Sequence, residues 1–209
     1  MPLLVIFGSR TALEVAEAAT ASHSREFDSI LVHYFEQSAF SSTLAPELES
    51  KYDRIYFHAG VADVDTKQGI VDACRKRGWL PFSVIHPTAV ISPSATIGGG
   101  SFIGALAVIS SHTVIGNHVI VHIHASIGHD ATIDEFSSIL PGARVSGNVR
   151  VGKRVLIGSN AFLNAGVSIG DDSQVDALTY VARDLPPSMI QSVRTSQPIP
   201  RLKRENEKR

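Results

Sequence analysis

The chain has very little cysteine, almost no net charge and no long apolar run. Its single cysteine, Cys74, excludes a disulfide within the chain. No stretch reaches the roughly 20 apolar residues of a membrane-spanning helix, and the N-terminus does not resemble a signal peptide. The net charge is −1, and no basic stripe with interleaved aromatic residues points to nucleic acid. These absences favour a cytoplasmic protein of ordinary globular composition.

A period of six residues is what the sequence does contain. Each sixth position from Ile85 to Val181 is Ile, Leu or Val, and a small or β-branched residue lies two positions earlier. Glycine often follows the aliphatic residue directly. A fixed repeat of this length predicts a parallel β-helix. The seventeen aliphatic positions are Ile85, Ile91, Ile97, Ile103, Ile109, Ile115, Val121, Ile127, Ile133, Ile139, Val145, Val151, Ile157, Leu163, Ile169, Val175 and Val181.

The period has a simple physical interpretation. One hexapeptide makes a short strand and a corner, and three make a triangular coil of about eighteen residues, so the repeat predicts a little over five coils. The aliphatic residue and the small residue both point into the prism. We expect the glycine after the aliphatic residue to relieve backbone strain at the turn. Ordering a coil costs most of what its burial contributes, so only the stack should be stable.

The first eighty or so residues show a different pattern, in which apolar runs alternate with helical periodicity. This alternation predicts a small α/β domain with a parallel sheet. The expected order is a strand at 3–7, a turn at Gly8-Ser9-Arg10, a helix from Thr11 to about Thr20, a strand at Ser29–Tyr34, a loop at 36–53, a strand at Arg54–His58, a loop at 59–63, a helix at Val64–Arg77 and a last strand at Pro81–Val84.

Three regions therefore divide the chain. We expect an α/β domain at 1–84, a β-helix at 85–187 and a cap or extended arm with a tail at 188–209. The sequence at 183–187, Arg-Asp-Leu-Pro-Pro, breaks the repeat. The charged residues Arg201–Arg209 read as a solvated tail without a function of their own.

His129 and Asp130 form the sharpest candidate for chemistry. They follow Ile127-Gly128, which places them at a corner of the prism and not in its core. A carboxylate beside an imidazole orients the ring and stabilises its protonated form, as a general base near neutral pH requires. Sequence alone leaves open the alternative that both are polar turn residues.

Other histidines and the first turn offer weaker candidates. His112, His118 and His124 are six residues apart, so they occupy one position on different faces and cannot bind a single metal ion within one chain. We therefore expect no metal. The turn at Gly8 ends a strand and opens a helix, where backbone N–H groups suit a phosphate, although an ordinary strand-to-helix turn fits equally well.

Several motifs together resemble one family. An α/β domain leads into His86-Pro87-Thr88-Ala89, and the β-helix carries Ile127-Gly128-His129-Asp130, Ser146-Gly147-Asn148-Val149 and Asp184-Leu185-Pro186-Pro187. This set resembles bacterial sugar acyltransferases of the PglD/NeuD type over residues 1 to about 187. The resemblance implies a Rossmann-like domain followed by a left-handed parallel β-helix. It also implies a homotrimer that uses acetyl-CoA, with the active site at the subunit interface.

The resemblance also implies roles for particular residues. His129 would be the general base, and Asp130 the carboxylate that raises its basicity. Acetyl-CoA contacts map to Ser138, Ser159 and Ala177, and contacts to a nucleotide-linked sugar map to Arg10, Thr11, Ala12 and Gly60. At position 138 this chain has serine where relatives often have a second histidine.

Three functions follow as hypotheses. The first is transfer of an acetyl group from acetyl-CoA to the amine of a nucleotide-linked 4-amino-4,6-dideoxy sugar. The second keeps the chemistry but places the acetyl group on a hydroxyl, as in O-acetylation of sialic acid. The third is a non-catalytic scaffold in which the β-helix only forms a trimer.

Overall fold

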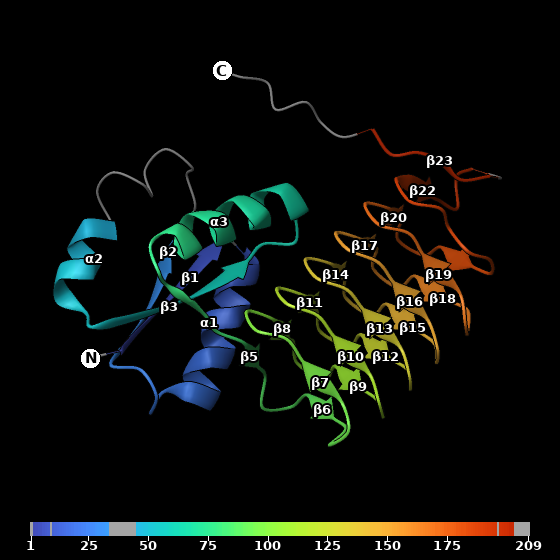
Figure 1. The fold of residues 1–209 in the computed structure, drawn as a ribbon. Helices are drawn as coiled ribbons and strands as arrows, with labels where there is room; N and C mark the ends of the chain where they lie inside the picture. The colour runs from blue at the N-terminus through green and yellow to red at the C-terminus, as the bar shows by residue number, and fades with distance from the viewer. Residues whose placement is uncertain (1, 9, 34–44, 196, 203–209) are drawn as a thin grey trace.

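The computed structural model describes residues 2–8, 10–33, 45–195 and 197–202, and places the chain in two packed parts. A small α/β domain lies beside one end of a long triangular prism (Figure 1). Both parts match the architecture that the sequence predicts. The charged tail at 203–209 falls outside the described residues.

The α/β domain is built on a four-stranded parallel sheet in the order β2-β1-β3-β4. Its strands are buried on both faces along most of β1, as expected for a sheet covered by helices. The elements are β1 (Pro2–Gly8), α1 (Arg10–His23), β2 (Ser29–His33), α2 (Ala45–Lys51), β3 (Arg54–Gly60), α3 (Val64–Lys76) and β4 (Leu80–Pro81).

Several boundaries differ from the sequence-based expectation; helix α1, for example, begins at Arg10 and ends at His23. The segment expected to be a loop at 36–53 contains α2, a short polar helix with only one buried residue and thus almost no apolar periodicity. Strand β3 runs on to Gly60, because its last residues pair with the end of β1. The strand expected at Pro81–Val84 is two strands: β4 pairs with β3, whereas Val84 already pairs with Phe102 of the prism.

The prism has three sheets of short parallel strands, which the chain visits in turn. We call them the domain face, the six-stranded face and the five-stranded face. The domain face contains β5 (Val84–Ile85), β8 (Phe102–Ile103), β11 (Ile120–Val121), β14 (Ser138–Ile139), β17 (Leu156–Ile157), β20 (Gln174–Val175), β22 (Met189–Gln191) and β23 (Ile199–Pro200).

The other two faces complete each coil. The six-stranded face contains β6 (Val90–Ile91), β9 (Val108–Ile109), β12 (Ser126–Ile127), β15 (Arg144–Val145), β18 (Phe162–Leu163) and β21 (Tyr180–Val181). The five-stranded face contains β7 (Thr96–Ile97), β10 (Val114–Ile115), β13 (Thr132–Ile133), β16 (Arg150–Val151) and β19 (Ser168–Ile169). Corner 1 follows the domain face, corner 2 follows the six-stranded face, and corner 3 follows the five-stranded face.

The aliphatic ladder fills the prism as predicted. The second residue of each strand points inward, and from Ile103 to Val181 these side chains are at most 3% exposed. The small residues two positions earlier, such as Ala107 and Ala125, are buried in the same core. From β5 to β21, strand partners within the prism are eighteen residues apart, as Ile109, Ile127 and Val145 illustrate. Equivalent side chains therefore stack along the whole prism.

The role expected for the repeat glycines is wrong. The left-handed corner residue is not the glycine that follows the aliphatic residue but the residue two positions further on, for example His112 with φ +56° or Leu106 with φ +57°. The glycine is needed for a close approach. A Cβ at Gly104 would lie 2.8 Å from the backbone nitrogen of Ile123, and one at Gly116 would lie 2.8 Å from that of Glu135.

The two parts share a continuous apolar interface. Leu4 and Ile6 of β1 and the inner face of α1 pack with Phe102 and Ile120, which point outward from the domain face. On the other side of the sheet, Phe136 of corner 3 joins the core formed with α3. The prism thus supplies part of the hydrophobic core of the α/β domain, which fixes how the two parts are oriented.

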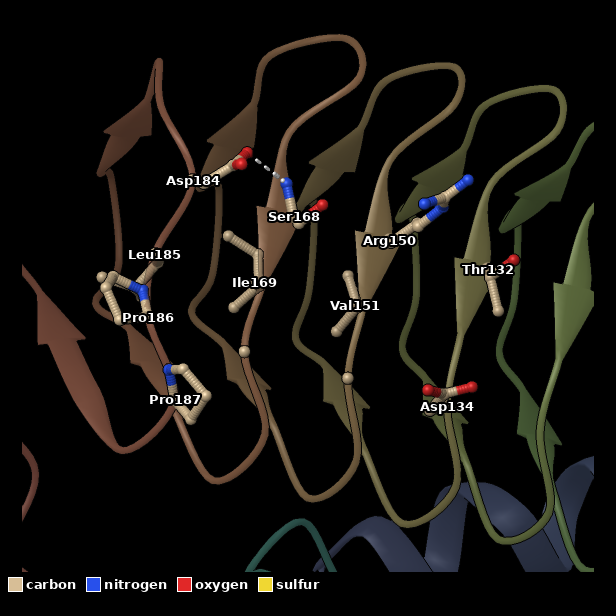
Figure 2. Close-up of a pocket in the computed structure, with 12 residues that line it drawn as sticks. Thr132, Asp134, Arg150, Val151, Ser168, Ile169, Asp184, Leu185, Pro186 and Pro187 are labelled. Atoms are coloured by element: carbon tan, nitrogen blue, oxygen red, sulfur yellow. Dashed lines mark hydrogen bonds between the residues drawn. The ribbon is translucent and has the colours of Figure 1, made fainter.

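The end of the repeat is closed by the proline-containing segment. The Asp184 carboxylate accepts a hydrogen bond of 2.8 Å from the Ser168 backbone, and Leu185 bridges to Ile169 (Figure 2). Strand β22 then pairs with β20, and β23 returns antiparallel to β22. This segment covers the last coil, whose edge would otherwise be open.

The ladder predicts a sharp difference between neighbouring residues of one strand. Ile109 is 1% exposed and Val108 is 42% exposed. We expect Ile109→Ala to lower the free energy of unfolding by about 2–4 kcal/mol, because it leaves a cavity in the stack. Val108→Ala should cost less than about 1 kcal/mol. Urea unfolding of both variants tests this, and equal losses would contradict an inward-facing ladder.

Candidate active site

His129 and Asp130 lie at corner 2 with their side chains directed out of the prism. The Nδ1 atom of His129 is 2.8 Å from an Asp130 carboxylate oxygen. The side chains are 61% and 51% exposed, so the pair faces solvent in the isolated chain. With Nδ1 engaged by the carboxylate, Nε2 is left to take a proton from an incoming group.

The backbone around this pair is held by neighbouring coils. Asp130 adopts a left-handed conformation with φ +56°, which aspartate tolerates better than most residues. Its N–H donates to the Ser111 carbonyl at 2.9 Å, and the His129 carbonyl accepts from the Asn148 N–H at 2.8 Å. One residue earlier, Gly128 donates to Val145 at 2.8 Å. The two side chains therefore project from a rigid base.

The predicted sugar-binding residues come together at the carboxyl ends of the central strands of the α/β sheet. Gly60, at the end of β3, lies so close to Ala12 that a Cβ would be 3.1 Å from its Cα. Ala12 is buried, whereas Arg10 is exposed and Thr11 half-buried at the start of α1. Strands β1 and β3 are neighbours although β2 intervenes in the sequence. Such a switch point is where open parallel sheets bind ligands.

Ser159 and Ala177 occupy equivalent places at corner 1 in successive coils. The Leu178 N–H donates to the Ser159 carbonyl at 2.9 Å, and a Cβ at Gly158 would lie 2.4 Å from the Ala177 nitrogen. Ser159 is half-buried and Ala177 exposed. These two residues are thus adjacent to each other but lie at a different corner from His129.

Ser138 does not lie on an accessible surface. It faces the α/β domain from strand β14 and is fully buried. Its hydroxyl donates to the Ala62 carbonyl at 3.1 Å and accepts a hydrogen bond of 2.9 Å from Lys67 Nζ. A direct contact between this hydroxyl and a surface-bound thioester, as the resemblance implies, does not fit this environment. In this chain Ser138 instead joins the two domains.

Lys67 is a buried ionisable residue that the sequence pattern does not reveal. Its ammonium group is buried at the domain interface, where the carbonyls of His118, Phe136 and Ser137 accept hydrogen bonds of 3.2–3.4 Å. Burial lowers its pKa to about 7, an effect that the nearby Asp63 carboxylate opposes. Its only sequence signal is a charge on the otherwise apolar face of α3.

Three histidines surround this lysine: His118, which its spacing excludes as a metal ligand, and His58 and His122, which belong to no sequence motif. Burial lowers the pKa of His58 to about 4, with a further lowering from Lys67 and a partial offset from the Phe82 carbonyl. Burial lowers the pKa of His118 to about 3, helped by Arg75. The pKa of His122 falls to about 4 for the same main reason. All three are therefore neutral in the folded chain at physiological pH.

Their surroundings explain this behaviour. His118 is stacked between Phe57 and Phe136, with ring centroids 6.0 and 5.1 Å away, and accepts from Arg75 at 3.1 Å. His122 lies 3.8 Å from the Glu14 carboxylate of α1. This contact also shows that the predicted sugar-binding end of α1 is close to corner 1 of the prism.

A shallow cavity of about 530 Å³ lies on the five-stranded face, which begins at the His129 corner. Arg150 lies on the coil between those of Thr132 and Ser168 along this face (Figure 2). None of the predicted site residues lines the cavity. The lining residues are Thr132, Asp134, Arg150, Val151, Gly152, Ser168, Ile169, Gly170, Asp184, Leu185, Pro186 and Pro187.

The described residues contain neither a cluster of metal ligands nor a membrane-spanning helix. Among them, no three His, Cys, Asp or Glu side chains gather closely enough to bind a metal ion. His112, His118 and His124 lie at corners 2, 3 and 1, each in the left-handed position of its hexapeptide. No helix within the described ranges has the length and apolarity needed to cross a bilayer.

The architecture is similar to that of known acetyltransferases. Residues 148–183 match a family described as the hexapeptide repeat of succinyl-transferase. The acetyltransferase domain of PglB from Neisseria gonorrhoeae, solved in complex with acetyl coenzyme A, has 27% identity and a TM-score of 0.81, with 95% of this chain and 98% of that chain covered. No curated protein matches the sequence. These likenesses support an acyltransferase with hexapeptide repeats.

Other solved structures share the fold at lower identity. A histidine-to-alanine mutant of GDP-perosamine N-acetyltransferase from Caulobacter crescentus, in complex with CoA and GDP-perosamine, has 24% identity and a TM-score of 0.81, covering 95% of this chain and 97% of that chain. WeeI from Acinetobacter baumannii has 18% identity and a TM-score of 0.80, covering 95% and 100%. The acyltransferase prism is thus a left-handed parallel β-helix, as the resemblance implied.

The buried histidines predict that acid destabilises the acyltransferase. Their folded pKa values of about 4, 3 and 4 lie below the ordinary value of 6.5, so the unfolded chain binds more protons below that pH. The contribution of these histidines to stability should therefore be complete above about pH 6.5 and be lost as the pH drops toward about 4. Urea unfolding between about pH 7.5 and about pH 5 measures the proton uptake.

A pair of variants separates this effect from general acid sensitivity. His118→Gln removes one titrating group from the interface, so unfolding should take up about one proton fewer. His124→Gln changes an exposed side chain and should leave the pH dependence as it is. An unchanged slope for His118→Gln would contradict the assignment of acid sensitivity to this cluster.

Proposed function

We propose that the acyltransferase moves an acetyl group from acetyl-CoA to the amine of a nucleotide-linked amino sugar of the 4-amino-4,6-dideoxy type. The observation that carries the proposal is the exposed imidazole of His129, paired with Asp130 at 2.8 Å, on this fold. The related PglB domain is described with acetyl coenzyme A and the Caulobacter enzyme with CoA and GDP-perosamine, an amino sugar. Acetyl-CoA is accordingly the co-substrate in this proposal.

The proposed chemistry is a direct transfer. The sugar amine attacks the thioester carbonyl, and His129 Nε2 takes the proton that the nitrogen loses. The C–S bond then breaks, and CoA leaves with that proton as a thiol while an amide remains on the sugar. Asp130 stabilises the imidazolium that forms between these steps. General-base catalysis of this kind contributes roughly 10²–10⁴ in rate.

The two substrates would approach from different parts of the molecule. The nucleotide would occupy the switch point of the α/β sheet, with its phosphates near the N–H groups of Arg10, Thr11 and Ala12. The other groups of the nucleotide would lie against Gly60. Acetyl-CoA would lie along corner 1, beside Ser159 and Ala177. We do not assign Ser138 to acetyl-CoA, because its hydroxyl is buried and bonded to Lys67 and Ala62.

The arrangement of corners supports a homotrimer. Within one chain His129 is at corner 2, whereas Ser159 and Ala177 are at corner 1, so a bound thioester reaches both only if two prisms lie side by side. In a closed ring of three, corner 1 of one prism can meet corner 2 of the next. We propose that each active site forms between neighbouring subunits.

Replacing the proposed base tests the function. His129→Ala should lower kcat by about two to four orders of magnitude while leaving the thermal unfolding temperature nearly unchanged, because the ring is exposed. His23→Ala, a change in the last turn of α1 and thus at the opposite end of that helix from the proposed sugar site, is the histidine control. The measurement is CoA release with acetyl-CoA and a nucleotide-linked amino sugar. Near-normal turnover of His129→Ala would refute the mechanism.

The choice of acceptor is decided in the same assay. Sialic acid, which offers hydroxyls, is compared with the amino sugar; preferential acetylation of sialic acid would replace the amine acceptor with a hydroxyl. Protection from thermal unfolding by acetyl-CoA separates an enzyme from a scaffold. No protection at millimolar concentrations, together with no turnover, would favour a β-helix that only assembles.

Mixed trimers test the shared site. His129→Ala and Ser159→Trp should each abolish activity as homotrimers, the first by removing the base and the second by blocking corner 1. When the two chains are co-expressed with different tags and purified as mixed trimers, some interfaces combine an intact base with an intact corner 1. Activity should return in those trimers. Its absence would place all contacts within one chain.

A further inference from the structure

Corner 2 carries an unusual residue directly above His129. The position two residues after the aliphatic ladder residue is occupied at this corner by Ser111, His129, Gly147 and Ala165 in successive coils. Strand pairing in steps of eighteen residues places them in one column. Gly147 is therefore the residue of the next coil that lies at the level of the His129 side chain.

The backbone does not require glycine at this position. Gly147 does not have a left-handed backbone conformation, whereas Gly142 and Gly166 do, with φ +69° and +76°. Other coils have side chains at the same hexapeptide position, including the two neighbours in this column. Serine, alanine, asparagine, isoleucine and lysine all occur there, at Ser111, Ala165, Asn117, Ile123 and Lys153.

The imidazole of His129 is what a side chain at 147 would meet. A Cβ on Gly147 would lie 2.6 Å from Nε2, 2.7 Å from Cε1 and 3.0 Å from Cδ2 of that ring. All three nearest atoms belong to the imidazole. By contrast, a Cβ on Gly128 would meet the backbone of Ser146 and Gly147. The histidine ring thus fills the space that the missing side chain of Gly147 leaves.

We infer that Gly147 is a positioning residue for His129. Asp130 holds Nδ1 at 2.8 Å, and the bare backbone of Gly147 lets the ring lean over the next coil. These two contacts together set the direction of Nε2. The packing of the ring on Gly147 is independent of any activity, whereas its effect on catalysis rests on the proposed function.

Gly147→Ala, the smallest possible change, should displace the ring without unfolding the chain. The ring is 61% exposed, so it can rotate into solvent and relieve the contact. It then loses its alignment with Asp130 and with an acceptor amine. We expect kcat to fall about 10- to 100-fold with KM values changed much less, because misplacement of a base by about 1 Å has effects of this size.

Gly99→Ala is the matched control. Gly99 occupies the same hexapeptide position at corner 3, but a Cβ there would meet only ordinary contacts, 3.7 Å from Pro81 and 3.9 Å from the Asn117 side chain. This variant should keep wild-type kcat. Thermal unfolding of both variants should lie within a few degrees of the wild type.

Two readouts need no substrate. The ring nitrogen NMR shifts of His129, assigned by comparison with His129→Asn, report its tautomer and its hydrogen bond to Asp130; they should move in Gly147→Ala and not in Gly99→Ala. In a double-mutant cycle, any loss of thermal stability caused by Gly147→Ala should disappear in the His129→Ala background, because the ring that it meets is gone.

The outcomes separate this inference from the proposed function. Unchanged His129 ring shifts in Gly147→Ala would overturn the positioning role, and so would an equal loss of stability in both backgrounds, which would mean that the backbone itself needs glycine. If the wild-type protein transferred no acetyl group, the proposed function would fail, while the ring shifts would still decide whether Gly147 positions His129.

Discussion

The stacking of one aliphatic side chain on its equivalent eighteen residues away is the interaction on which the rest of the structure depends. It is strictly periodic, so each coil repeats the geometry of the one before it. Each buried side chain contributes roughly 1.5–3 kcal/mol, and ordering the coil consumes most of this. The prism is therefore stable as a stack, and its surface positions are fixed relative to one another without long-range connections.

This regularity is also what gives the site its precision. A side chain at a corner is held by a backbone that bonds to the coils on both sides, as at His129 and Asp130. Adjacent coils bring chosen residues within a few ångströms, and Gly147 over His129 is an example. Most corner positions of a repeat accept many residue types. A corner position that accepts only glycine therefore indicates that a neighbouring group occupies the space of its side chain.

The interface between the two domains follows different rules. It combines apolar packing of α1 on the prism with a buried lysine, and with three histidines whose pKa values burial lowers. Lys67 Nζ lies within hydrogen-bond distance of three carbonyls and the Ser138 hydroxyl, which share its N–H donors. Such a polar centre is costly to bury and tolerates few other arrangements, which suits an interface that must hold the sheet edge at a fixed place beside the prism.

The sequence by itself determined the prism. Ile, Leu or Val at every sixth position leaves one way to bury the aliphatic residues, and the corner location of His129 and Asp130 follows from counting. It also determined that an α/β domain precedes the prism, since apolar runs alternate with helical periodicity. The short helix α2 escaped because a polar helix with one buried residue carries no periodic signal.

Only the tertiary structure decided the surroundings of individual residues. Ser138 occupies an outward position in its hexapeptide and becomes buried because the α/β domain packs on that face. Lys67, His58 and His122 meet across sequence separations that no local pattern encodes. The purpose of the repeat glycines was likewise hidden, because a clash with the next coil depends on distances between coils and not on the order of residues along one.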